Sequence, residues 1–199
     1  MEGKLLQFLT TMNLHSVLTL VTILLWVMVT AYWILTSRET SDHHRRTEIF
    51  SFIKLIGSFL IIYLPLIFGG FIGAILLSPS RAMDFIGLTF CLLGIGLMVW
   101  ARQYLGKNWS GNVVLQDEHT ITKGGPYQFV RHPIYAGGLF AMLGSALMIG
   151  EIFGLVWVLF CAFGLIRKAR QEEELLTGKF PAEYRLYKQQ TKMLIPLIW

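Results

Sequence analysis

The sequence predicts an all-α membrane protein with five transmembrane helices, the last two of which form a helical hairpin. Two observations lead to this fold class. Of the 199 residues, 54% are hydrophobic and only 15% are charged, whereas a soluble domain carries about 25% charged residues. The uncharged residues also lie in long continuous runs, and about 20 apolar helical residues span the roughly 30 Å core of a bilayer.

Five uncharged runs account for the five helices. They are residues 14–35, 55–80, 85–101, 133–150 and 152–166. The first two are long enough to span and the third is adequate. The last two are separated only by Glu151, so together they are too long for one crossing and suit a tight hairpin. The first run is too long for the apolar part of a signal peptide and no small-residue cleavage site follows it, so we expect it to stay as a helix.

The basic residues predict the orientation. With five helices, residues 36–48, 102–132 and 167–199 share one side, and they hold 14 of the 17 lysines and arginines. By the positive-inside rule the amino terminus is outside and the carboxyl terminus is cytoplasmic. The net charge of +5 then reflects topology and anionic lipid headgroups, and it is weak support for nucleic-acid binding.

Three polar clusters fall on the predicted cytoplasmic side. They are Asn108 to Ser110, the segment from Tyr127 to Tyr135, and Glu172 to Glu174. The loop 102–132 is long for so small a membrane protein, and such loops are usually functional. It contains a possible small hairpin around Asp117–His119 and a strong turn at Gly124-Gly125-Pro126. Because residues 133–166 form a hairpin, the loop and the exit of the last helix converge at one end.

Several strings in these clusters resemble one family of membrane enzymes. LGKNWS, GGPYQFVRHPIYAGG and QEEELLTGKFPAEYRLY begin at Leu105, Gly124 and Gln171. They resemble the isoprenylcysteine carboxyl methyltransferase and phospholipid methyltransferase family of integral membrane methyltransferases. The resemblance covers about residues 85–196, so residues 1–199 are expected to form a single integral membrane domain with a methyltransferase-like core at 85–199. The role of residues 1–84 is unassigned.

The resemblance implies a cytoplasm-facing pocket for S-adenosylmethionine that needs no metal. The residues implied to bind this cofactor are Tyr127, His132, Tyr135, Gly137, Glu172 and Glu173; those implied to be catalytic are Glu172, Glu173 and Arg131. Carboxylates suit the ribose or ammonium group, aromatic rings the adenine, and Arg or His the carboxylate of such a ligand. Where the family commonly has Phe-Gly, this chain has Phe180-Pro181, which puts the placement of Tyr184 and Tyr187 in question.

Each of these residues also has a purely structural interpretation. In this interpretation Arg131 anchors the chain at lipid headgroups, and His132 caps a turn. The glutamates form a solvated helix face in this interpretation, and Glu174 is the best candidate for a surface ion pair with Arg170. Gly137 belongs to a stripe of small residues at every fourth position, a pattern that favours close helix packing. The cysteines, Cys91 and Cys161, are expected to pack in apolar helices.

The expected function is transfer of a methyl group from S-adenosylmethionine to a lipophilic, lipid or prenylated substrate at the cytoplasmic membrane interface. The resemblance is to carboxyl O-methyltransferases, and the residues are compatible with a carboxylate, an amine or a thiol as the acceptor group. Two alternatives remain. One is an NADPH-dependent membrane reductase of the sterol reductase type, which has an RHP-like string followed by Asn-Tyr where Ile134-Tyr135 stands here. The other is a non-catalytic membrane scaffold or sensor.

Overall fold

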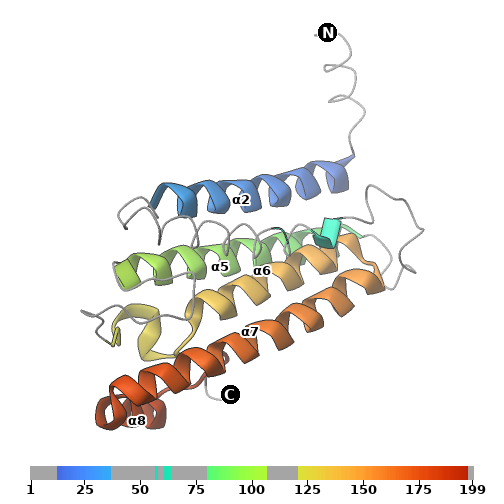
Figure 1. Cartoon of the computed structure of the whole chain (residues 1–199). Coiled ribbons are helices and arrows are strands. Elements are labelled where there is room, and N and C mark those ends of the chain that lie inside the picture. Colours follow the sequence, from blue (N-terminus) through green and yellow to red (C-terminus); the bar gives the residue numbers. More distant parts are fainter. Residues whose placement is uncertain (1–12, 37–56, 58–60, 64–79, 107–120, 197–199) are drawn as a thin grey trace.

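The computed structural model describes residues 13–36, 57, 61–63, 80–106 and 121–196. This part of the chain is built from α-helices that lie alongside one another (Figure 1). The elements are α2 (Leu14–Thr36), the 3-10 turn η2 (Ile61–Tyr63), α5 (Arg81–Leu105), the 3-10 turn η4 (Gly125–Gln128), α6 (Pro133–Ile149), α7 (Ile152–Lys179) and α8 (Pro181–Gln190). Among the described residues three helices, α2, α5 and α7, are long and apolar enough to cross a membrane, and α6 is a shorter apolar helix.

The centre of the bundle is the pair α5 and α6, which approach each other through reciprocal glycines. A Cβ atom placed on Gly94 would lie 2.4 Å from the carbonyl oxygen of Gly137, and one on Gly137 would lie 2.6 Å from that of Gly94. Gly87 and Gly144 repeat this arrangement two turns away, with 2.6 Å and 2.4 Å to each other's carbonyl oxygen. In a membrane, small residues at such positions let two backbones come close and gain dispersion contacts.

Helix α2 runs parallel to α5 and is attached to it at both ends. At the amino-terminal ends, Nδ1 of His15 lies 2.6 Å from Oδ1 of Asp84. At the carboxyl-terminal ends, Arg102 donates to the carbonyl oxygen of Gly106 at 2.9 Å and to that of Thr36 at 3.4 Å. Arg102 thereby supplies donors to backbone carbonyls that the last turns of two helices leave unpaired.

A buried polar cluster joins α2 to α6 at mid-length. The indole nitrogen of Trp26 donates to the hydroxyl of Ser145 at 3.1 Å, and the hydroxyl of Tyr63 lies within hydrogen-bond distance of the hydroxyls of Ser145 and Thr22, at 2.9 and 3.0 Å. Ser145 in turn donates to the carbonyl oxygen of Ala141 at 3.1 Å. Trp26 and Ser145 are completely buried. The hydrogen bonds therefore satisfy polar groups that would otherwise lack a partner in an apolar interior.

The last two long helices form a hairpin. Helix α6 begins at Pro133, a residue suited to the first helical position, and ends at Ile149; its C-cap, Gly150, lies in the left-handed region with φ 73°. Helix α7 begins at Ile152 and continues for 28 residues, a length of about 42 Å. That is longer than the roughly 30 Å bilayer core requires.

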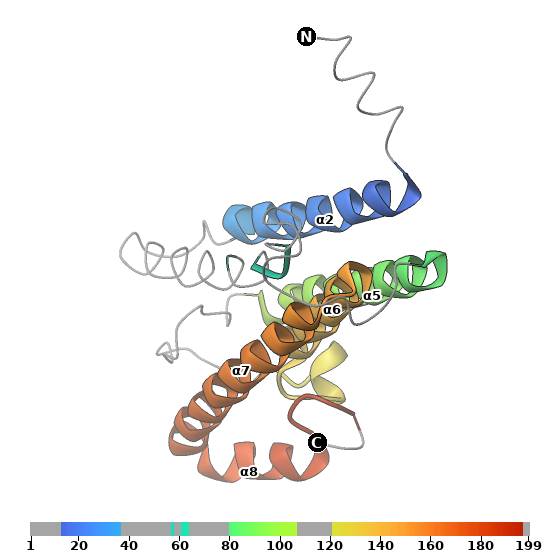
Figure 2. The ribbon, with the colours of Figure 1, turned by 90° about the vertical axis from the view of Figure 1, so that its right-hand side faces the viewer.

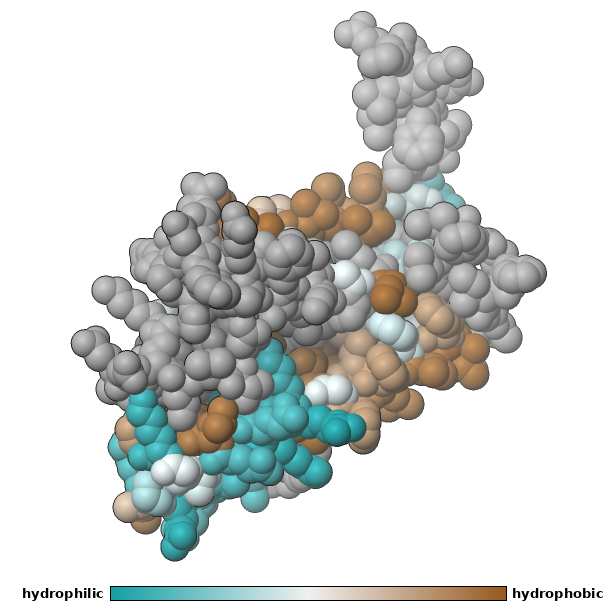
Figure 3. All heavy atoms as spheres, in the orientation of Figure 1, coloured by the Kyte–Doolittle hydropathy of each residue, from teal (hydrophilic) through white to brown (hydrophobic). Residues whose placement is uncertain are grey.

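The end of α7 and the crosswise helix α8 form the polar end of the molecule (Figure 2). Hydrophilic side chains gather there, whereas hydrophobic ones cover much of α2 and the opposite end of α7 (Figure 3). Helix α8 begins at Pro181 and buries Tyr184 and Tyr187. The Phe180-Pro181 departure noted in the sequence therefore leaves both tyrosines in the core of this end, because proline is compatible with a helix start.

Four of the five uncharged runs lie in helices, and the all-α prediction is confirmed for the described residues. The helix predicted over 55–80 lies mostly outside those residues, so the count of five membrane helices stays a prediction. The possible hairpin around Asp117–His119 and the cluster from Asn108 to Ser110 also lie outside them.

Candidate functional site

The segment that leads into α6 is shaped by a glycine and then held by the end of the chain. Gly125 has a φ of +58°, and a Cβ atom there would lie 2.7 Å from the ring of Tyr104. Both facts favour glycine. The turn η4 follows and buries Tyr127, whose backbone carbonyl accepts a hydrogen bond from the hydroxyl of Tyr187 at 2.6 Å.

Residues 130–132 then pair with the segment after α8. Val130 and Lys192 form an isolated parallel β-bridge. The backbone nitrogens of Arg131 and His132 donate to the carbonyl oxygens of Lys192 and Met193 at 2.8 and 3.1 Å. These bonds connect parts of the chain about 60 residues apart in sequence. The RHP string is therefore fixed from one side by residues 191–193, which we call the C-terminal strap.

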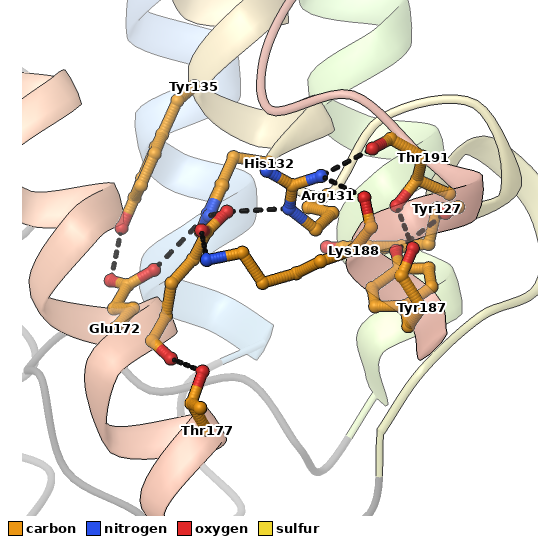
Figure 4. Close-up of polar contacts among 10 residues, drawn as sticks. Tyr127, Arg131, His132, Tyr135, Glu172, Thr177, Tyr187, Lys188 and Thr191 are labelled. Carbon is orange, nitrogen blue, oxygen red and sulfur yellow. Dashed lines mark hydrogen bonds and ion pairs between the residues drawn. The ribbon is translucent and has the colours of Figure 1, made fainter. Parts of the chain in front are cut away.

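Two adjacent glutamates of α7 meet this string from the other side (Figure 4). Arg131 Nε donates to Oε1 of Glu173 at 2.6 Å, and the hydroxyl of Tyr135 donates to Oε1 of Glu172 at 2.5 Å. His132 lies between them: its Nδ1 is 3.4 Å from Oε2 of Glu172 and its Nε2 is 3.4 Å from Oε1 of Glu173. The His132 and Tyr135 rings are parallel, with centroids 5.5 Å apart.

Helix α8 and the strap supply further partners that the sequence did not indicate. Lys188 Nζ lies 2.8 Å from Oε2 of Glu173. Arg131 also donates to the carbonyl oxygens of Thr191 and Lys188, the latter at 3.4 Å. Lysine at position 188 was visible only as one of the basic residues of the tail. The spacing Tyr184, Tyr187, Lys188 on one helix was a usable signal, since the two tyrosines define the buried face and Lys188 borders it.

The carboxylates control the charge of His132. Burial disfavours the imidazolium and lowers the pKa of His132, but the contacts with Glu172 and Glu173 outweigh burial, so the pKa ends above its usual value of 6.5. Burial also raises the pKa of Tyr187, to about 12, and raises that of Tyr127 further. Both phenols therefore remain protonated donors at physiological pH.

The structure brings together, near one end of α7, five of the seven residues expected at the cofactor site or in catalysis: Arg131, His132, Tyr135, Glu172 and Glu173. Tyr127 lies behind them, held by Tyr187. Gly137 faces α5 instead, and the close approach to Gly94 by itself accounts for the absence of a side chain. A contact between Gly137 and the cofactor stays a prediction. Glu174 is exposed, and Cys91 and Cys161 are buried.

Several known proteins are similar to this chain in sequence. The chain is 32% identical over 111 residues to the cobalt-zinc-cadmium resistance protein CzcN of Cupriavidus metallidurans, covering 55% of this chain and 49% of that protein. It is 30% identical over 122 residues to protein-S-isoprenylcysteine O-methyltransferase of Saccharomyces cerevisiae, covering 60% and 51%. The chain thus spans about half the length of these curated relatives.

The fold is similar to a solved structure of the eukaryotic intramembrane Ras methyltransferase, isoprenylcysteine carboxyl methyltransferase. The TM-score is 0.55 with 22% identity, over 80% of this chain and 55% of that chain. Together with the long apolar helices, this shows an all-α, integral, multi-pass membrane protein. The family model described as Phospholipid methyltransferase matches residues 82–183, just over half of the sequence. The chain therefore belongs to the phospholipid methyltransferase family.

Proposed function

We propose that this protein transfers a methyl group from S-adenosylmethionine to a lipophilic acceptor at the cytoplasmic membrane interface. Family membership and the likeness to a protein-S-isoprenylcysteine O-methyltransferase support the reaction class. The names of the family and of this relative cover a phospholipid and a prenylated cysteine, so a lipophilic acceptor is the common element. A carboxyl O-methyltransferase-like activity is the more specific proposal.

The observation that carries the proposal is the convergence of the RHP-x-Y string with the glutamate pair at the polar end of an apolar bundle. The residues suit the cofactor chemically. Nε2 of His132 is buried without a hydrogen bond to any described residue, and Glu172 presents a carboxylate that is only partly covered, with 22% of its side chain exposed. A ligand that carries both hydrogen-bond donors and acceptors matches such a set.

Each residue has a role in the proposal. Bound S-adenosylmethionine would supply a methyl group already activated by its sulfonium. The Glu172–Glu173 pair is proposed to supply the carboxylate that binds its donors, and the rings of Tyr127, His132 and Tyr135 to line the pocket. The protein then has mainly to align the groups and exclude water. A carboxylate acceptor needs no base, whereas an amine or thiol must lose a proton, for which a glutamate carboxylate is the nearest candidate.

The placement in the membrane is part of the same proposal. Helices α2 and α5 are parallel, as the first and third crossings of a five-helix arrangement are, and this supports five crossings. The amino terminus is then outside and the site is cytoplasmic. Residues 1–199 act as one integral domain, with 85–199 as the methyltransferase core. The acceptor reaches the site laterally from the bilayer, while the cofactor comes from the cytoplasm.

Ligand binding to the purified full-length protein tests the reaction class. We expect titration calorimetry to show binding of S-adenosylhomocysteine that EDTA leaves unchanged, and no binding of NADPH. Labelled methyl transfer into a prenylcysteine analogue or phosphatidylethanolamine should fall about a hundredfold in Glu172→Gln, because a charged hydrogen bond is lost in a shielded site. The exposed Glu174→Gln variant is the control and should change activity less than about threefold. NADPH binding without a response to S-adenosylhomocysteine would establish the reductase alternative instead.

A further inference from the structure

We propose that Lys188 is a positioning residue of this site, which holds Glu173 and Arg131 in place so that Glu172 alone is the glutamate that contacts the ligand. This inference rests on the proposed function and divides the work of the two carboxylates. It also gives α8 a role at the site in addition to burying Tyr184. Lys188 and the C-terminal strap lie outside the segment 82–183 that the family model matches.

The carboxylate of Glu173 is fully occupied by the protein. Oε1 accepts from Arg131 at 2.6 Å and lies 3.4 Å from Nε2 of His132, while Oε2 lies 2.8 Å from Nζ of Lys188. Only 4% of the side chain is exposed. A buried carboxylate with a basic partner on each oxygen is stabilised as an anion. It has little capacity left for a proton or for a ligand donor.

The carboxylate of Glu172 is different in each respect. One oxygen accepts from the Tyr135 hydroxyl, and the other is 3.4 Å from Nδ1 of His132, beyond a good hydrogen bond. Its side chain is 22% exposed against 4% for Glu173. Adjacent residues of a helix point about 100° apart, so the two cannot share one environment. Glu172 is the carboxylate with an accessible edge.

Lys188 is required for this division because it neutralises the second oxygen of Glu173. Arg131 is already committed to Oε1 of Glu173 and to the carbonyl oxygens of Lys188 and Thr191. Without the Lys188 ammonium, Oε2 becomes a buried anionic oxygen with no partner, which is costly. Glu173 then has to rotate or take up a proton. Either change disturbs Arg131 and His132, and His132 is the residue that also contacts Glu172.

A double-mutant cycle tests this arrangement. The variants are Lys188→Met, Lys188→Arg, Glu173→Gln and the combination of Lys188→Met with Glu173→Gln, all in the full-length protein. The matched control is Arg185→Met, which removes one exposed positive charge from the same helix. The measurements are calorimetric affinity for S-adenosylhomocysteine, the melting temperature without ligand, and kcat and KM for labelled methyl transfer.

We expect Lys188→Met to weaken affinity for S-adenosylhomocysteine about tenfold, which is about 1.4 kcal/mol, and to raise KM for S-adenosylmethionine more than it lowers kcat. Lys188→Arg should recover affinity to within about threefold, because it restores the charge. In the Glu173→Gln background, Lys188→Met should change affinity less than about twofold, because no buried charge remains to be neutralised. Arg185→Met should match the wild type.

Two results would overturn the role of Lys188: normal affinity in folded Lys188→Met protein, or a full tenfold effect of Lys188→Met on top of Glu173→Gln. If Lys188→Met alone does not fold, the double variant should fold and bind like Glu173→Gln, and an unfolded double variant would also reject the proposal. A wild-type protein that ignores S-adenosylhomocysteine would reject the proposed function itself, which is a separate outcome.

Discussion

His132 is in contact with two carboxylates that α7 turns in different directions. Its ring nitrogens lie 3.4 Å from Glu172 and from Glu173, and it is the N-cap of α6 without capping that helix through its side chain. The imidazole therefore contacts the two carboxylates and does not cap the helix. Protonated His132 contributes a positive charge between two negative ones, which makes its charge state important for the stability of the site.

This charge state predicts a pH dependence of stability. The pKa of His132 is raised above 6.5 in the folded protein, so the folded state binds the proton more tightly than the unfolded state. That contribution is fully present below about pH 6.5 and is lost as pH rises through the folded pKa. We expect the melting temperature of the wild type to fall relative to His132→Gln between pH 6.5 and 9. A constant difference over this range would show that His132 is neutral in the fold.

At the scale of elements, the interface between α5 and α6 depends on the absence of side chains. The Cβ positions of Gly94 and Gly137 meet backbone atoms of the opposite helix, and backbone cannot move aside as a flexible side chain can. Both helices also contribute completely buried residues to the core, including Cys91, Met98, Ala141 and Met142. An added methyl group here has to separate two packed helices.

Gly94→Ala should therefore be destabilising. A methyl group at Gly94 would lie 2.4 Å from the carbonyl oxygen of Gly137, and overpacking of this kind costs about 1–3 kcal/mol. The control is Gly96→Ala on the same helix, where nothing lies within 4 Å of the new Cβ. Melting temperatures in detergent compare the two. Equal stability of both variants would mean that the helices are not packed at the distance given by the structure.

The elements that sequence periodicity and composition predicted are those with strong local signals. Apolar runs located α2, most of α5, α6 and the first part of α7, and Pro133 located the start of α6. The C-terminal strap was not foreseen, because it forms a single β-bridge with a segment about 60 residues earlier. Such a pairing has no local pattern. The glycine contacts of Gly87 and Gly94 were also missed, since a glycine's partner lies on another helix.

The site was predictable as a set of residue types but not as a division of roles. The motifs located Arg131, His132, Tyr135 and the glutamates, and the structure gathers them at one end of the bundle. Which glutamate is enclosed depends on Lys188, and that contact arises only when α8 turns back across the end of α7. The packing role of Gly137 similarly depends on which face of α6 meets α5.

At the scale of the whole molecule, polarity is divided between the two ends of the bundle. The hydrophilic end contains the last turns of α7, α8 and the strap (Figure 3). It coincides with the carboxyl-terminal ends of α2 and α5, which Arg102 joins. The opposite end holds the contact between His15 and Asp84 and the short link at Gly150. Among the residues that the structure describes, Arg81 lies at the opposite end, whereas the basic residues of the end of α7, of α8 and of the strap lie at the first, so the two ends differ in charge as well as in hydropathy.

This asymmetry predicts the orientation in the membrane. Of the 17 basic residues, 14 fall in segments that the five-helix arrangement places on one side, and an excess of lysine and arginine marks the cytoplasmic side. A reporter fused after Trp199 should be active in the cytoplasm, whereas the same reporter inserted after Gly150 should be active only on the other side. The insertion at Gly150 is the matched control because, among the described residues between the two positions, α7 is the only candidate membrane span. A cytoplasmic signal at Gly150 together with an external one at Trp199 would invert the protein and expose the glutamate pair to a compartment without the soluble cofactor. Signals on the same side would mean that α7 does not span.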